Sequence, residues 1–311
     1  MDLTLRQIRN FVAVADAGKV SLAGSALGIS QSAITTSMQA LEAETGIKLV
    51  KRHRRGVNLT QDGYQFLNHA RKILAAVSDA TRALKNSNTN LKGFVRLGIP
   101  PTVAGYFLAT PLMHFQRVYP NVEVRIAELE RSKIEQGLID GSLDLAIQLM
   151  SPLPDPKRIK TQTMFSSRRR LWLAPGHRLT SVPNIHLSDL AKEPYLLLTT
   201  DDNTKTTFRY WQKHGLKPCV YFRTATIEAI RNLVAANAGV TILSDMVYRP
   251  WSLQGERIEV RPIADELPDL KIGIAWKKER KLDNCTKELR DFCLEGTGIH
   301  YSYPGTHNQR D

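Results

Sequence analysis

The sequence predicts an α/β protein with two folding units: a small helical unit with one β-hairpin, followed by a larger unit of alternating strands and helices. Its 311 residues suit about two domains of ordinary size. Apolar residues recur at helical spacing in the first part of the chain. From Gly93 onward, short apolar runs alternate with helical patterns, which favours βαβ units.

The composition excludes several classes of protein. Apolar residues make up 42% of the chain, too many for a disordered one. No apolar run approaches the roughly 18 residues of a membrane-spanning helix, and residues 1–6 lack the features of a secretory signal. We therefore expect a cytoplasmic protein with no membrane partner. Cys219, Cys285 and Cys293 lack a paired spacing and are expected to be unbridged thiols, with a redox role for Cys219 left open.

Positive charge is concentrated in the N-terminal part of the chain. The whole sequence has 43 Lys and Arg against 30 Asp and Glu, a net charge of +13. Residues 1–92 hold 13 of the basic and 6 of the acidic residues, whereas the rest of the chain holds 30 and 24. The shorter part therefore has the higher positive charge per residue, which predicts that it binds a polyanion.

Three short helices are expected in the N-terminal part. Their signals are a helical repeat from Leu5 that stops at Gly18, a cap at Ser21 with a stop at Gly28, and a cap at Ser30 with a stop at Gly46. Two helices joined by a short turn at Gly28 form a helix-turn-helix. Ala23 and Ala26 are small and are expected where the two helices cross.

The outer face of the third helix favours DNA binding. It carries small polar side chains: Gln31, Ser32, Thr35, Thr36 and Gln39. Such a face can enter a major groove and meet base edges, whereas an ordinary solvated face would mix Glu and Lys. A basic run follows at residues 51–60, with Gly56 and Asn58 as turn residues. We interpret this run as a β-wing whose arginines contact phosphate or the minor groove: Arg52, Arg54 and Arg55.

A long amphipathic helix of about 28 residues is expected from a cap at Thr60, which makes it roughly 40 Å long. Its stripe contains Tyr64, Leu67, Arg71, Leu74, Val77, Thr81 and Leu84. A compact domain cannot bury so long a stripe, so we expect a dimerisation helix over residues 60–90. The polar residues 85–90 are expected to form a linker.

The larger part of the chain is expected to be two α/β halves with a mostly parallel sheet. Strands are expected at residues 95–99, 122–127, 143–147, 171–173, 195–198, 240–243 and 270–277. Helices are expected from 101, from a cap at Ser132, and at about 204–214, 227–236 and 285–294. The crossovers between halves are placed near 163 and 266. Arg168, Arg169 and Arg170 are expected to be a solvated strand edge.

Ligands of open α/β sheets bind beyond the carboxyl ends of strands, here between the two halves. The polar residues expected there are Pro101, Thr102, Glu128, Gln148, Thr199, Thr200, Asn203, Thr224 and Thr226. Thr102 and Thr200 are the leading pair for contacting a small organic anion. Glu128 would disfavour a second carboxylate, so the ligand's charge stays open. The competing interpretation is that these hydroxyl groups only cap helices and form turns.

The sequence does not predict an enzyme, a metal site or a cofactor. It contains no GxSxG, HExxH, GxxxxGK[ST] or GxGxxG motif in a suitable position. Asp201, Asp202 and Asn203 could suggest a metal site, but an acidic turn is more often a loop. The histidines His177, His186 and His214 have no metal-ligand spacing.

At the N-terminus the sequence resembles the LysR-type transcriptional regulators. The resemblance rests on the segments LRQIRNF at 5–11, SLAGSAL at 21–27, SQSAI at 30–34, LE at 41–42 and LTQDG at 59–63, together with Gly46, Leu49 and Arg52. Three positions depart from the family pattern: Ser32 where proline is common, Val50 where phenylalanine is usual, and Thr36 where relatives often have arginine. The last departure implies a different base preference.

The resemblance extends to the larger part through DLAI at 144–147 and AGVTIL at 238–243. It implies a winged helix-turn-helix at 1–59, a linker helix at 60–90, a two-subdomain periplasmic-binding-protein-like effector domain at 91–295, and a flexible tail at 296–311.

The expected function is a regulator whose binding to double-stranded operator DNA responds to a small organic effector. The expected partners include a second copy, in a dimer or a homotetramer through the linker helix and the effector domains, and RNA polymerase. The alternative is a cytosolic small-molecule-binding protein or an enzyme with a basic N-terminal extension.

Overall fold

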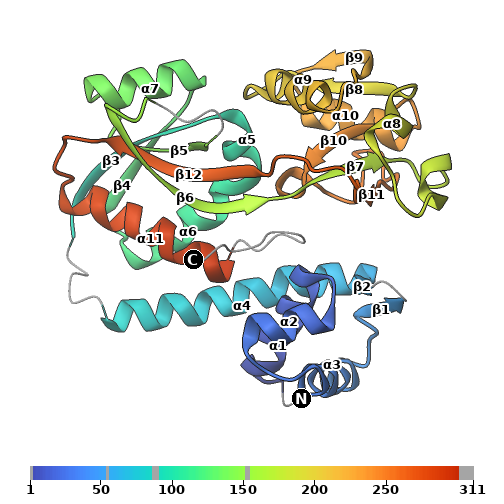
Figure 1. Cartoon of the computed structure of the whole chain (residues 1–311). Helices are drawn as coiled ribbons and strands as arrows, with labels where there is room; N and C mark the ends of the chain where they lie inside the picture. The colour runs from blue at the N-terminus through green and yellow to red at the C-terminus, as the bar shows by residue number, and fades with distance from the viewer. Residues whose placement is uncertain (1–2, 54–55, 86–90, 151–154, 301–311) are drawn as a thin grey trace. The chain divides into compact units, whose positions relative to one another are not determined.

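The computed structural model describes residues 3–53, 56–85, 91–150 and 155–300, and these ranges form two compact units (Figure 1). Unit 1 comprises residues 1–95, 110–124 and 282–311, and unit 2 comprises residues 96–109 and 125–281. Within the described ranges, no helix is long and apolar enough to cross a membrane.

Unit 1 begins with the predicted helices and hairpin. Its elements are α1 (Leu5–Ala17), α2 (Val20–Leu27), α3 (Gln31–Thr45), β1 (Val50–His53), β2 (Gly56–Leu59) and α4 (Gln61–Lys85). The three predicted stops at Gly18, Gly28 and Gly46 are confirmed, since each lies directly after its helix with a positive φ of 63°, 65° and 68°. Thr4 caps α1 by accepting the backbone N–H of Gln7, and Ser30 caps α3 by accepting that of Ala33.

Two predictions about the second helix were wrong. Ser21 is not its cap, because α2 already begins at Val20 and its N-cap is Lys19. Ala26 is exposed, whereas Gly24 is buried. A Cβ on Gly24 would lie 2.8 Å from the carbonyl oxygen of Ile29, so this glycine makes the close approach at the turn.

Helix α4 packs on the core of the N-terminal helices. Leu67, Ala70 and Leu74 are buried together with Phe11 and Leu41. The expectation that the α4 stripe cannot be buried within its own domain is therefore wrong for Leu67 and Leu74. On the same helix, Arg71 Nη2 donates to Asp16 Oδ1 of α1 at 2.6 Å. The side chains of Tyr64, Thr81 and Leu84, and residues 86–90, lie outside the described residues.

Unit 1 also contains most of α6 (Ala109–Val118) and α11 (Asn284–His300). The ring of Phe115 meets that of Phe292 edge-on with 5.5 Å between centroids, and Tyr119 Oη donates to Glu288 Oε2 at 2.7 Å. Helix α11 runs to His300, beyond the expected start of the tail, and residues 301–311 lie outside the described part of the chain.

Most of the remaining elements belong to unit 2. They are β3 (Gly93–Ile99), α5 (Pro101–Val103), the π-helical η1 (Ala104–Leu108), β4 (Val122–Glu128), α7 (Arg131–Asp140), β5 (Leu145–Leu149), β6 (Ile159–Ser167), β7 (Arg169–Leu173), the 3-10 helix η2 (Arg178–Ser181), α8 (Leu187–Leu190), β8 (Pro194–Leu198), α9 (Asn203–Lys213), β9 (Cys219–Thr224), α10 (Ile227–Ala235), β10 (Thr241–Ser244), the 3-10 helix η3 (Asp245–Val247), β11 (Glu259–Arg261) and β12 (Leu270–Lys277).

The sheets are mixed, not mostly parallel as expected. A five-stranded sheet has the order β4-β3-β5-β12-β6, and we call the part of unit 2 built on it lobe I. Lobe II contains the sheet β10-β7-β11 and the pair β8-β9. β3 runs parallel to β5 and β8 to β9, but β12 is antiparallel to β5 and β6, and β7 to β10 and β11. The antiparallel pairs arise because the chain passes between lobes along β6–β7 and β11–β12.

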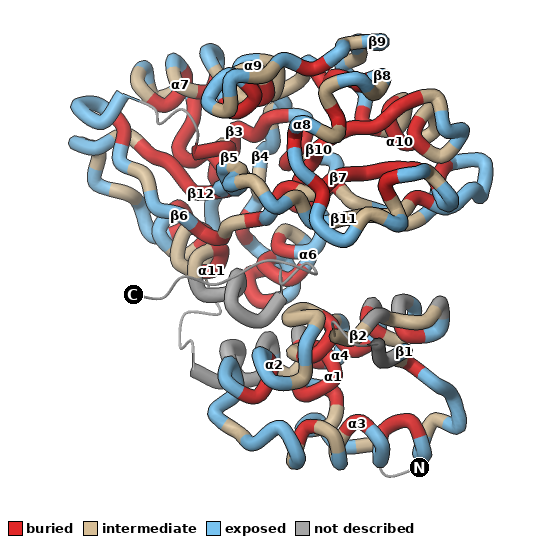
Figure 2. Tube along the Cα trace, turned by 45° about the vertical axis from the view of Figure 1, so that its right-hand side comes forward, coloured by how far each residue is buried: buried red, intermediate tan, exposed pale blue. Residues whose placement is uncertain are grey.

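The core of lobe I lies along β5 and β12 and that of lobe II along β7, β8 and β10, which are mostly buried (Figure 2). In lobe II the rings of Tyr195 and Trp211 pack edge-on, with 5.7 Å between their centroids.

In lobe I, Asp144 was expected to be part of a strand, but β5 begins one residue later. Its carboxylate accepts bonds from Arg96 Nη2 at 2.7 Å and Arg280 Nη2 at 2.8 Å.

Two smaller expectations about these elements are corrected. Ser132 is not a cap, because Glu130 precedes α7 and makes no side-chain capping bond. Arg169 is buried and Arg170 pairs with Asp245, so the arginine run is not a solvated edge.

Candidate DNA-binding surface and ligand cavity

Helix α3 presents a polar face to solvent. Gln31, Ser32, Thr36 and Gln39 are exposed and Thr35 is half-buried. The opposite face is fixed by Ile34, Met38 and Leu41, each no more than 2% exposed. This division follows from the helical period, because apolar residues at i, i+4 and i+7 face the core and turn the polar residues outward.

The predicted wing is an antiparallel hairpin in which Val50 pairs with Leu59 and His53 with Gly56. It is anchored to the end of α1, because the backbone N–H of Val57 donates to the carbonyl oxygen of Gly18 at 2.8 Å. Gly56 has a φ of 148°, and a Cβ there would collide with the same carbonyl oxygen, so this position requires glycine. Arg54, Arg55 and the side chain of Arg52 lie outside the described residues.

A second anchor of the wing is Glu42, which the sequence did not indicate. Its carboxylate accepts the backbone N–H groups of Leu49 at 2.9 Å and Val50 at 3.1 Å, and the Lys48 ammonium at 2.8 Å. Burial alone would raise the pKa of Glu42, but the bonds from Lys48, Val50 and Leu49 hold it below its usual value. The Glu42 carboxylate therefore faces the wing strand and does not oppose a phosphate.

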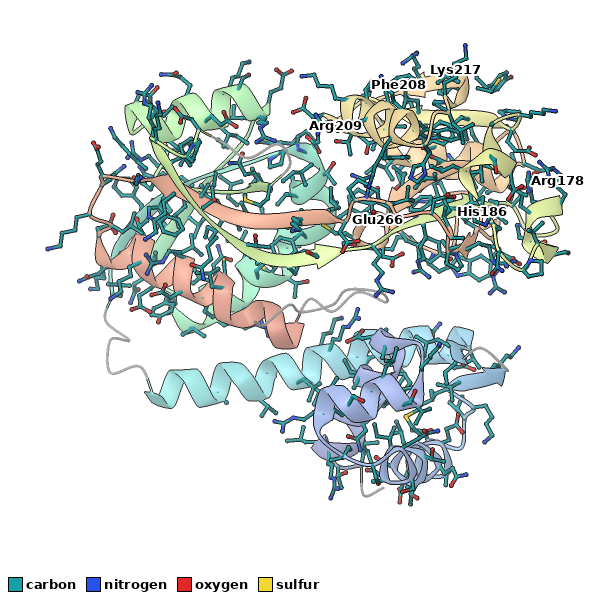
Figure 3. The ribbon with its side chains drawn as sticks, viewed as in Figure 1. Arg178, His186, Phe208, Arg209, Lys217 and Glu266 are labelled. Atoms are coloured by element: carbon teal, nitrogen blue, oxygen red, sulfur yellow. The ribbon has the colours of Figure 1, made fainter. Side chains whose placement is uncertain are left out.

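In unit 2, a cavity of about 360 Å³ lies among side chains from both lobes. Of the nine predicted effector residues, Thr102, Thr200 and Asn203 line it. Its apolar wall includes Leu149, Leu198, Ile227, Leu243 and Val247. Arg209 on α9 and Glu266 before β12 are exposed residues of its lining (Figure 3).

The other predicted effector residues do not line this cavity: Pro101, Glu128, Gln148, Thr199, Thr224 and Thr226. Pro101, Glu128 and Thr199 are exposed. Thr224 and Thr226 bond to each other at 3.0 Å through their hydroxyl groups, which fits the turn interpretation. Gln148 lies inside β5 at 1% exposure, and its amide has no hydrogen-bond partner among the residues that the structure describes.

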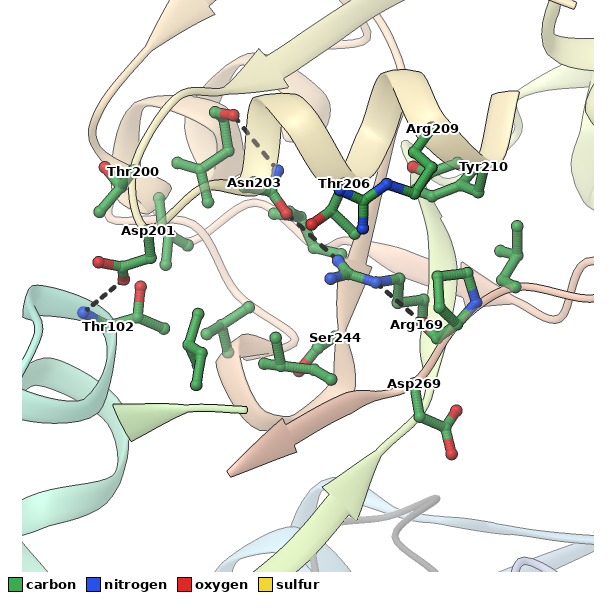
Figure 4. A pocket seen from close by; sticks show the side chains of 18 of the residues that line it. Thr102, Arg169, Thr200, Asp201, Asn203, Thr206, Arg209, Tyr210, Ser244 and Asp269 are labelled. Atoms are coloured by element: carbon green, nitrogen blue, oxygen red, sulfur yellow. Dashed lines mark hydrogen bonds between the residues drawn. The ribbon is translucent and has the colours of Figure 1, made fainter. Parts of the chain in front are cut away.

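Arg169, expected from the sequence to be a solvated strand edge, lines the cavity. It is 9% exposed, and its guanidinium donates from Nη1 to Asn203 Oδ1 at 3.2 Å and from Nε to the carbonyl oxygen of Pro268 at 3.1 Å (Figure 4). Both acceptors are neutral, and no carboxylate of the described residues forms an ion pair with it. Burial lowers the pKa of Arg169. One signal could have found it, because Arg169 shares the period-two pattern of buried Leu171 and Leu173.

Asp201, which follows the same strand as Thr200, is a further residue of the cavity lining. Its Oδ2 accepts the backbone N–H of Thr102 at 3.1 Å, so lobes I and II meet here (Figure 4). Asp201 and its neighbour Asp202 have φ values of 56° and 59°, a left-handed pair directly before α9. Burial raises the pKa of Asp201, against the lowering effect of its bonds with Thr102.

Other chemistry is not assembled in the described ranges. No group of three or more His, Cys, Asp or Glu among them could hold a metal ion. Cys219 is exposed, whereas Cys285 and Cys293 are buried, and all three are unbridged thiols.

A winged helix-turn-helix together with a two-lobed α/β domain that encloses a ligand-sized cavity defines a ligand-responsive transcriptional regulator. Residues 5–64 match the family model of bacterial regulatory helix-turn-helix proteins of the lysR family, and residues 88–298 match that of the LysR substrate binding domain. The chain belongs to the LysR family.

Individual relatives agree with this assignment. The chain is 30% identical to the HTH-type transcriptional regulator CfxR of Cupriavidus necator over 95% of its own length and 92% of the relative's. It is 28% identical to the HTH-type transcriptional regulator YnfL of Escherichia coli over 93% and 97% of the two chains. The structure of HinK, a LysR family transcriptional regulator from Pseudomonas aeruginosa, matches with a TM-score of 0.62 at 28% identity, over 95% and 99%. The regulator class is thereby confirmed over the enzyme alternative.

Proposed function

We propose that the protein binds operator DNA through α3 and the wing, and that a small organic anion bound at Arg169 modulates this binding. The observation that carries the effector part is the buried guanidinium of Arg169, which has only neutral partners among the described residues. Burying a charge without a counterion is costly, and removing its partner from a buried pair costs several kcal/mol. A ligand carboxylate would supply the missing charge.

Arginine suits this role better than lysine would. Its planar fork can hold a carboxylate through two parallel hydrogen bonds. Arg169 uses Nε and Nη1 for Pro268 and Asn203, which orients the fork. No hydrogen bond of Nη2 to a described residue is found, so this atom is available to a ligand. Thr102 and Thr200 remain the proposed polar contacts on the opposite side.

For the DNA part, we assign base contacts to Gln31, Ser32, Thr35, Thr36 and Gln39, and phosphate contacts to Arg52, Arg54 and Arg55. The exposed polar face of α3 supports the first group, and the hairpin beside it supports the second. Counterion release then predicts that affinity falls with salt, with a slope of about −0.9 per phosphate neutralised.

We further propose a dimer or tetramer, formed through α4 and the effector domains, that acts in the cytoplasm and contacts RNA polymerase. Ile73 of α4 is 37% exposed although its neighbour Leu74 is buried, which leaves an apolar side chain for a second copy. Light scattering of the purified chain tests the oligomer, since a monomer at micromolar concentration would contradict it.

The effector assignment is tested by thermal unfolding of the full chain with a panel of small carboxylates. A ligand that binds only the folded state raises the melting temperature. We expect stabilisation of the wild type and none of Arg169→Met, with Arg257→Met, at an exposed position outside the cavity lining, as the matched control. Equal stabilisation of both variants by the same carboxylate would place the anion elsewhere.

A further inference from the structure

We propose that the ligand of this cavity is a zwitterion, whose carboxylate binds Arg169 and whose ammonium group binds Asp201. This inference rests on the proposed function and names the chemical class of its effector. The cavity has a buried cation at one side and an acidic side chain at another, and neither forms an ion pair with a described residue, although Asp269 of the lining adds a longer-range attraction to Arg169.

The position of Asp201 decides against a second carboxylate. Its carboxylate bonds to the backbone N–H of Thr102, a group that could otherwise receive a ligand anion. In Figure 4, Asp201 lies beside Thr102, and Arg169 lies beside Asn203, away from that pair. The protein's own carboxylate therefore occupies the donor at the Thr102 side. The lining cations Arg209 and Lys213 are exposed, so Arg169 is the buried cation that is left for an anionic group.

The charges separate the candidate ligand classes. A monocarboxylate would satisfy Arg169 and leave Asp201 in apolar surroundings without a cation. A dicarboxylate would place its second charge against Asp201, where like charges repel. A diamine would satisfy Asp201 and oppose Arg169. A zwitterion pairs both groups, and the aliphatic wall of Leu149, Leu198 and Leu243 suits the carbon chain between its ends.

The test uses four probes that share one five-carbon chain: 5-aminopentanoate, pentanoate, glutarate and 1,5-diaminopentane. Their affinities for the full-length protein are measured by isothermal titration calorimetry, and the set is repeated with chains one carbon shorter and one carbon longer. We expect the aminocarboxylate to bind most tightly at the chain length that fits. Because a charge-assisted hydrogen bond is worth about a factor of ten or more, pentanoate should bind roughly tenfold more weakly.

Asp201→Asn isolates the acidic group, and Asp202→Asn is the matched control. Both residues lie in the same left-handed turn, which asparagine tolerates, but Asp202 pairs with Lys205 at 3.2 Å and does not line the cavity. Asp201→Asn should weaken 5-aminopentanoate about tenfold and leave pentanoate unchanged or tighter. Asp202→Asn should leave the order of the probes as in the wild type.

The outcomes distinguish this inference from the proposed function. One outcome is that glutarate or pentanoate binds at least as tightly as 5-aminopentanoate at every chain length, and that Asp201→Asn does not change the order of the probes. This outcome overturns the proposal of a zwitterionic ligand and keeps the proposal of a carboxylate at Arg169. Diaminopentane binding most tightly, or no carboxylate binding, overturns both. A selective loss of the aminocarboxylate in Asp201→Asn alone supports the zwitterion.

Discussion

Asp245 is 2% exposed beside Arg170, and its Oδ2 has no hydrogen-bond partner among the described residues. Burial raises the pKa of this carboxyl to about 6, although Arg170 lowers it in part. The folded state therefore holds a proton that the unfolded state, with a pKa near 3.8, releases. Between these values the folded chain binds more protons, so the free energy of unfolding contributed by Asp245 falls as pH rises.

Asp245→Asn should remove this dependence. The wild type is expected to lose about 2 kcal/mol of unfolding free energy from this group between pH 4 and pH 6, out of about 3 kcal/mol over the whole titration at about 1.4 kcal/mol per pKa unit. Urea unfolding followed by tryptophan fluorescence measures it, since Trp172 and Trp211 are buried in the same lobe. Glu279→Gln, at an exposed position, should keep the wild-type slope. An unchanged slope in Asp245→Asn would contradict the buried-carboxyl account.

Single residues also show where sequence reasoning reached its limit. Thr102, Thr200 and Asn203 were predicted because residues after strands gather at one edge of a sheet. Arg169 was not, because its role depends on burial and on contacts between segments far apart in sequence. Its guanidinium, for example, donates to the carbonyl oxygen of Pro268, 99 positions away.

Among the elements, those with a strong internal pattern were predicted best. Strand β12 has the expected bounds because its continuous apolar run is buried on both faces. The strands β6 and β9 were not predicted as such. Both lie at sheet edges. β9 is exposed or half-buried along its whole length, and the buried residues of β6 are irregularly spaced, so neither strand has an apolar alternation that the sequence could show.

The wing depends on Glu42, and Glu42→Ala tests this dependence. The change leaves the backbone N–H groups of Leu49 and Val50 without their acceptor, which costs about 1–3 kcal/mol for a buried group. We expect a lower melting temperature and weaker DNA binding. Glu44→Gln, at an exposed position on the same helix, is the control. Equal melting temperatures for the two variants would show that the wing is held by other contacts.

The recognition surface of α3 is tested by Thr36→Ala, at an exposed position of that helix. A lost base contact is expected to cost about 1–3 kcal/mol of specific binding and to leave the salt-dependent binding to random DNA unchanged. Electrophoretic shifts on a fragment selected by the wild type, and on a scrambled fragment, separate these terms. Parallel losses on both fragments would identify Thr36 as a backbone contact or a structural residue.

At the scale of the whole molecule, two of the hydrogen bonds that join the lobes of unit 2 begin in the segment directly after β3. One is the bond from Thr102 to Asp201 at 3.1 Å. The other is the bond from Tyr106 Oη to Glu228 Oε1 at 2.8 Å, and Glu228 Oε2 in turn accepts from the buried Arg231 at 3.0 Å. Because both lobe I residues follow β3 within one turn of each other, a ligand at Thr102 can act on both of these hydrogen bonds.

The central claim is that one chain couples an anion at Arg169 to DNA binding. The most direct test measures operator affinity with and without the carboxylate that stabilises the protein most, in the wild type and in Arg169→Met. Coupling of about 1–3 kcal/mol is typical, so we expect a change of at least about fivefold in the wild type and none in the variant, whose affinity without ligand stays at the wild-type level. The same ligand-dependent change in Arg169→Met, or a ligand that binds without altering operator affinity, would contradict the account.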